Sequence, residues 1–220
     1  MKILDSYFSL KKNELLLGII AINLLLLWLS KNILINETVF FNTYSEQMTY
    51  DRSMELFKKI RELSWVSYLF TPVMLIIKFS VLSLVIYVGF FISGLQEEVT
   101  LGMIFTAVVA SEIIIVLASL AKFLWFAFFA GNYTLDDMNF FYPLSLINLF
   151  GQTEVAKYWI YPLQCVNLFQ VAYILMLAIG LAKVSSVKKE KADIIVLLTY
   201  GSAFILWIAF IMFITIDIYS

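Results

Sequence analysis

The chain alternates between long apolar runs and shorter polar connections. Five runs, each long enough to form a membrane-crossing helix, cover about residues 15–35, 66–92, 101–130, 159–181 and 194–216. A helix needs about 20 apolar residues to cross the hydrocarbon core of a bilayer, whereas open strands would leave backbone polar groups unpaired in lipid. The pattern therefore predicts an all-α polytopic transmembrane helical bundle of about five spans.

Two of the connections have patterns of their own. The polar connection 36–64 contains a stretch, 51–63, in which an apolar residue recurs every three positions, namely Met54, Phe57, Ile60 and Leu63. This stretch predicts an amphipathic helix that either lies at the membrane interface or docks a partner. The second apolar piece, 140–150, is too short to cross, so we expect a short re-entrant or interfacial helix there.

Composition agrees with a single integral membrane domain over residues 1–220. The chain is 62% apolar and 14% charged, whereas about a quarter of the residues of soluble domains are charged. Its net charge of −1 provides no basic field for nucleic acid. The N-terminal lysines before the first run resemble a signal peptide, but the run is long and lacks a small-residue cleavage site. We therefore interpret it as a retained span.

Several classes of chemistry lack their usual residues. The chain has no histidine, and its single cysteine is Cys165. Histidine-dependent triads, zinc motifs and an internal disulfide are therefore excluded. No glycine-rich phosphate loop is present either. We predict no catalytic, cofactor-binding or metal-binding residues and no cofactor, so the chain is not expected to be an enzyme.

Two charges stand near the middle of apolar runs. Lys78 lies in the second run and Glu112 in the third, and the two runs are joined by a short connection. Counted from that connection, their depths differ by about five residues, or roughly 7 Å. A lysine side chain covers most of that distance, so we predict a buried ion pair between spans two and three. The pair could fix helix register, form part of a proton or ion relay, or bind a substrate headgroup.

A polar strip marks the fourth run. Gln164, Asn167 and Gln170 recur every three residues, which places them on one side of a continuous helix. Amides in lipid usually form hydrogen bonds with neighbouring helices, at about 1 kcal/mol or less each. We therefore interpret them as a polar strip between helices, with the lining of a polar cavity as the alternative.

Five spans place the two termini on opposite sides, and basic residues near span ends indicate which side is cytoplasmic. Seven lie on the side of the N-terminus: Lys2, Lys11, Lys12, Lys183, Lys188, Lys189 and Lys191. Six lie on the other: Lys31, Arg52, Lys58, Lys59, Arg61 and Lys157. The tight lysine-rich connection after the fourth run favours a cytoplasmic N-terminus and an external C-terminus.

The order of elements resembles a known family. The quoted segments are TLGMIFTAVVASEIIIVLASL (100–120), FFYPLSLINLF (140–150) and IGLAKVSSVKKEKADIIVLL (179–198). Over about residues 65–217 the layout is similar to the Yip1-domain family of five-span membrane proteins, in a compact bacterial form. The resemblance implies a helical membrane domain with a cytosolic N-terminus and an external C-terminus. The long acidic N-terminal region of eukaryotic members, which are associated with vesicle traffic and small GTPases, is missing here. The resemblance carries over no functional residues.

These observations predict a non-enzymatic integral membrane protein in a bacterial inner membrane. It would act through a protein partner, as a homo-oligomer, or by organising the lipid bilayer, as a component of an assembly. The alternative is a transporter or channel subunit with a polar intramembrane site around Lys78 and Glu112. A third possibility is a lipid-modifying enzyme that works without histidine.

Overall fold

The computed structural model describes residues 7–8 and 10–219 and, over these residues, contains helices and no strand. The prediction of an all-α bundle is confirmed. Lys2, which entered the charge count above, lies outside the described residues. Four helical segments are long and apolar enough to cross a membrane: Lys12–Leu34, Trp65–Ile92, Leu101–Phe128 and Lys189–Ile218.

The four long segments are not all uniform α-helices. The first consists of α2 (Lys12–Leu29) and the π-turn η1 (Ser30–Leu34), and the second is α5 (Trp65–Ile92). The third is divided into α6 (Leu101–Ser111) and α7 (Ile113–Phe128). The last comprises α11 (Lys189–Val196), the π-turn η3 (Leu197–Gly201) and α12 (Ser202–Tyr219). π-Turns within helices are rare and are frequent at functional sites.

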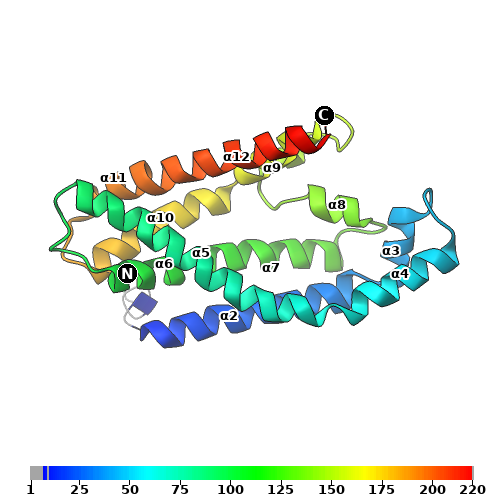
Figure 1. The fold of residues 1–220 in the computed structure, drawn as a ribbon, viewed down its shortest axis with the longest axis horizontal. Helices are drawn as coiled ribbons and strands as arrows, with labels where there is room; N and C mark the ends of the chain where they lie inside the picture. Colours follow the sequence, from blue (N-terminus) through cyan, green and yellow to red (C-terminus); the bar gives the residue numbers. More distant parts are fainter. Residues whose placement is uncertain (1–6, 9, 220) are drawn as a thin grey trace.

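The fourth predicted span is not a continuous helix. The run 159–181 is divided into α9 (Lys157–Cys165) and α10 (Leu168–Val184), because Val166 and Asn167 leave helical geometry and Asn167 is extended. At 17 residues, α10 alone covers only about 25 Å. The two pieces still run beside the last span, since α9 packs on α12 and α10 on α11 (Figure 1).

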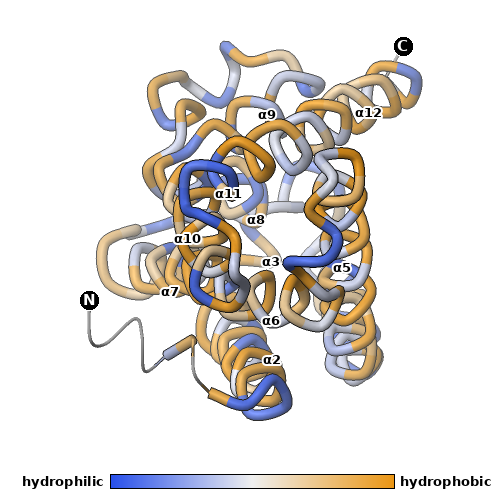
Figure 2. Tube along the Cα trace, turned by 90° about the vertical axis from the view of Figure 1, so that its left-hand side faces the viewer, coloured by the Kyte–Doolittle hydropathy of each residue, from blue (hydrophilic) through white to orange (hydrophobic). Residues whose placement is uncertain are grey.

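The two ends of the bundle differ in what they contain. One end, here called the N-side, holds the start of α2 and the connections 93–100 and 185–188 (Figure 1). The opposite end, the C-side, holds the connection 36–64, the loop after α7 and the end of α12. The hydrophilic residues nearest the viewer in Figure 2 belong to the N-side. The interrupted α9–α10 element thus supplies the fifth passage between the two sides.

The connection 36–64 folds into a helical hairpin on the C-side, made of α3 (Glu37–Tyr44) and α4 (Tyr50–Glu62). On α4, Phe57 is buried and packs on Phe40, with ring centroids 5.3 Å apart. Ile60 and Leu63, however, are exposed. The predicted helix is therefore present, and only part of its apolar face packs on α3, since residues every three positions drift about 60° per step around a helix.

The apolar piece 140–150 is not the short helix that we predicted. It begins with the last residue of α8 (Leu135–Phe140), continues as extended chain and ends in the 3₁₀ turn η2 (Leu146–Leu149). Leu144 has a positive φ of 52°, which an α-helix cannot accommodate. Ile147 is fully buried and anchors the piece in the fold, whereas Leu144 and Leu149 are exposed.

The core is concentrated in the N-side half. Five of the eleven residues of α6 are fully buried apolar residues, namely Ile104, Ala107, Val108, Val109 and Ala110, and they face α5 and α10. Small residues allow membrane helices to approach closely. The tightest approach is at Gly89 of α5, where an added Cβ would collide with the Thr199 methyl group of η3.

We expect Gly89→Ala to lower thermal stability in detergent, by about 1–3 kcal/mol, because the methyl group forces α5 away from η3. The matched control is Gly18→Ala on α2, which meets nothing within 4 Å and should be neutral or slightly stabilising. Both variants can be followed by a melting curve of the purified protein. Equal melting temperatures would show that the approach of α5 and η3 does not hold the bundle together.

Candidate intramembrane polar site

Glu112 occupies the single-residue interruption between α6 and α7. Its backbone N–H donates to Val109 O at 3.2 Å, three residues back, and the Ser111 hydroxyl donates to Ala107 O at 2.7 Å. The bond from Glu112 N interrupts regular α-helical pairing at one point within the third span. The Glu112 side chain is only 2% exposed, so its carboxylate lies inside the bundle.

The structure brings Lys78 of α5 onto this carboxylate, as predicted from the two depths. The Lys78 ammonium lies 2.6 Å from Oε1 and 2.8 Å from Oε2 of Glu112. Both carboxylate oxygens therefore accept hydrogen bonds from one cation, and the two charges neutralise each other in a medium of low dielectric constant. Such a pair compensates its own desolvation cost only while both partners are present.

The Lys78 side chain is 41% exposed although its partner is buried. It forms one end of a groove of about 530 Å³ on the surface of α5, whose lining comprises Ser67, Phe70, Thr71, Met74, Leu75 and Lys78. We call this the α5 groove. One member of an intramembrane ion pair is thus reachable from outside the bundle.

The three amides of the fourth run do not form a strip on one helix, which corrects that prediction. Asn167 begins α10: its Oδ1 accepts from Gln170 N at 2.7 Å, and its Nδ2 donates to Gln164 O and Cys165 O. Gln164 Nε2 donates to the carbonyls of Asn139 and Phe140, at 2.6 and 2.7 Å. Asn167 therefore satisfies the backbone around the helix break, whereas Gln164 links α9 to the end of α8.

Gln170 also acts between helices, as predicted, and it contacts a pair of tyrosines. Its Nε2 donates to the Tyr200 hydroxyl of η3 at 2.6 Å, and the Tyr200 and Tyr173 rings lie 5.4 Å apart. The Tyr173 hydroxyl is buried and forms no hydrogen bond with any described residue. Tyr142, Tyr173 and Tyr200 all lie within electrostatic range of Glu112.

Sequence reasoning missed these tyrosines. The only signal was a phenol within an apolar run, which generally needs a hydrogen-bond partner when buried. Tyr173 and Tyr200 come from different elements, and Tyr142 follows α8, so only the fold brings them toward Glu112. Together with the ion pair, they give the centre of the bundle a polar interior beside the helix break.

One further charged residue of the third span lies apart from this centre. Lys122, ten residues after Glu112, faces a separate groove against α2. Cys165 ends α9 and is half-buried. Within the described part of the chain, no three metal-binding side chains form a cluster. The arrangement can hold charge and hydrogen-bonding groups inside a membrane, and it places one lysine side chain at a surface groove.

Comparison with protein-family models, curated proteins and solved structures finds no significant match. The resemblance to the Yip1-domain family therefore stays a prediction.

We expect Lys78→Met and Glu112→Gln each to lower the folded yield and melting temperature in detergent. Lys78→Met should be the more harmful, because it strands a buried carboxylate, and loss of one partner of a buried pair costs about 3–5 kcal/mol. The double variant should recover much of the loss, which a double-mutant cycle measures directly.

The control for this cycle is Lys189→Met. Lys189 pairs with Asp193 at 2.6 Å on the exposed surface of α11, where such pairs contribute about 0–1 kcal/mol. If Lys78→Met changes stability no more than Lys189→Met, the intramembrane pair does not stabilise the fold.

Proposed function

We propose that the chain is a non-enzymatic integral membrane protein that binds a transmembrane helix of another protein along the α5 groove. It would work as a component of a membrane assembly. The observation that carries this proposal is the half-exposed side chain of Lys78 in the middle of a membrane-spanning helix. A mid-membrane lysine that faces lipid is costly, and such residues almost always face a bundle interior or a polar cavity.

The C-side parts of α5 and α12 are loosely packed. Over the stretch 65–78 of α5, and over the part of α12 whose side chains are described, no residue is buried. The two helices also diverge toward the C-side in both views (Figures 1 and 2). The N-side halves, in contrast, pack tightly around Gly89. The C-side half of α5 is therefore available to a partner.

The chemistry of the groove favours a helix over lipid chains. Ser67, Thr71 and Lys78 recur at spacings of four and seven, so they share one face of α5. The Ser67 hydroxyl accepts a hydrogen bond from Lys31 at 2.7 Å, which leaves its own proton free to be donated. Hydroxyl-bearing faces of this kind form interhelical hydrogen bonds, which acyl chains cannot provide.

The proposed location is a bacterial inner membrane with the N-side in the cytoplasm. Support comes from the excess of basic residues on that side, including the tight connection of residues 185–188 between α10 and α11. The resemblance to the Yip1-domain family favours the same orientation.

Photo-crosslinking tests the partner. A photoreactive amino acid at Thr71 in native membranes should give one crosslinked protein product of defined mass. The same group at Leu17, exposed on α2, is the control and should give none. Thr71→Trp should fill the groove and reduce the amount of that partner that co-purifies, with the melting temperature of the chain unchanged.

The mass of the product decides what the occupant is. A product of twice the chain mass identifies a second copy, and any other single mass identifies a different protein. Crosslinks to lipid alone, or equal products from Thr71 and Leu17, would contradict partner binding at this groove.

A second candidate is a transporter or channel subunit. The interrupted fourth span favours it, since discontinuous helices form substrate and ion sites near the midplane in many transporters. Asn167 places that interruption beside the polar interior, where the Tyr173 hydroxyl lacks a partner among the described residues.

Flux measurements test this candidate. If the chain conducts protons or a solute, proteoliposomes should show flux that Glu112→Gln abolishes. The folded double variant Glu112→Gln/Lys78→Met is the control which shows that the loss of flux is not a loss of folding. Flux that is absent from the unaltered protein, or unchanged in Glu112→Gln, would rule out conduction through this centre.

A further inference from the structure

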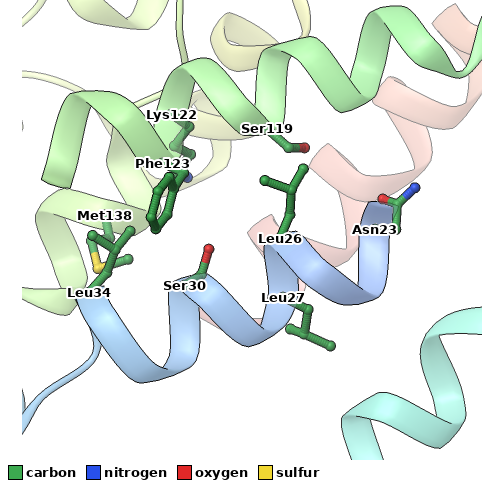
Figure 3. A pocket seen from close by; sticks show the side chains of 9 residues that line it. All are labelled: Asn23, Leu26, Leu27, Ser30, Leu34, Ser119, Lys122, Phe123 and Met138. Atoms are coloured by element: carbon green, nitrogen blue, oxygen red, sulfur yellow. The ribbon is translucent and has the colours of Figure 1, made fainter. Parts of the chain in front are cut away.

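A second groove lies between α2 and α7, on the C-side of the bundle. It has a volume of about 260 Å³. Four polar residues line it, namely Asn23, Ser30, Ser119 and Lys122, among apolar walls that include Leu26 and Phe123 (Figure 3). In Figure 3 the side chains of Leu26 on α2 and Ser30 on η1 point toward α7. Lys122 and Phe123 extend from α7.

The depth of Lys122 matches the level of lipid phosphates. The span Leu101–Phe128 has 28 residues and is therefore about 42 Å long, about 12 Å longer than the hydrocarbon core. If the excess is shared equally, about 6 Å protrudes at each end. Lys122 lies six residues, or about 9 Å, from the end of α7, so its backbone is about 3 Å below the headgroup boundary. Its side chain can reach that boundary by snorkelling.

The polar groups of this groove have unused hydrogen-bonding capacity. The Lys122 ammonium and the hydroxyls of Ser30 and Ser119 form no hydrogen bond or ion pair with the rest of the described chain. Two other lysines within spans differ, because Lys78 is paired with Glu112, and Lys31 donates to Ser67. A cation and two hydroxyls that have no partner within the described chain thus line one groove.

We infer that this groove binds the phosphate of an anionic membrane lipid. Lys122 supplies the charge and Ser30 and Ser119 donate to phosphate oxygens, while the acyl chain lies on the apolar wall formed by Leu26 and Phe123. A phosphate is favoured because ammonium and hydroxyl groups are donors that match the two charged, non-bridging oxygens of a phosphodiester. A lipid is favoured over free phosphate because the site opens along membrane-spanning helices and its walls are mostly apolar.

The test compares two lipids with identical acyl chains, added to the purified full-length protein in detergent. Phosphatidylglycerol should raise the melting temperature more than phosphatidylcholine, because ligand binding to the folded state stabilises it. Lys122→Met should abolish this preference and weaken phosphatidylglycerol binding about tenfold, the effect of losing one charged hydrogen bond. Lys122→Arg should retain the preference.

Two further variants complete the test, one as a charge control and one as an independent change in the groove. Lys58→Met removes one positive charge on the exposed surface of α4, on the same side, and should leave the preference intact. Ser30→Ala/Ser119→Ala keeps the charge of Lys122 and should reduce the preference several-fold, so the inference is tested even if Lys122→Met does not fold.

Three outcomes would overturn the inference. The first is equal stabilisation by both lipids, and the second is a preference that survives both Lys122→Met and the double serine variant. The third is an equal shift with inorganic phosphate alone, which would assign the groove to a soluble anion.

Discussion

The fold depends on one constraint: inside a bilayer, every backbone polar group must be satisfied within the protein. The chain meets this constraint even where its fourth apolar run departs from helical geometry. Around the break, Leu146 N donates to Val166 O at 3.0 Å and Leu168 N to Leu144 O at 3.1 Å. The side chain of Asn167 satisfies further backbone groups. These hydrogen bonds hold the segment after α8 against the broken helix.

The same constraint explains how two charges are tolerated in the middle of the bundle. Glu112 lies where helical hydrogen bonding is already interrupted, and Lys78 reaches it from the neighbouring α5. Neutralising each other, they link two helices at a depth where either charge alone would be unfavourable. Because the Lys78 side chain is partly exposed, its ion pair with Glu112 reaches the protein surface as well as the interior.

The two halves of the bundle differ in packing, and this difference has functional consequences. On the N-side, small residues of α6 and Gly89 of α5 allow helices to approach closely. On the C-side, α5 and α12 diverge, and polar side chains line grooves that face outward. One half is a stable core, and the other presents the surfaces on which the proposed binding sites lie.

The sequence by itself determined the class of the fold and the similar depths of the two central charges, whereas the structure decided that they face each other. Long apolar runs leave helices as the only viable structure in lipid, and the depth of a residue in a span follows from simple counting. The break at Asn167 could not be found in this way, because apolarity predicts that a run enters the membrane and does not predict that it stays helical. The gathering of Tyr142, Tyr173 and Tyr200 near Glu112, and the different environments of Lys78 and Lys122, were decided only by tertiary structure. Rotation and contact between helices depend on side chains from distant parts of the chain, and no local pattern records them.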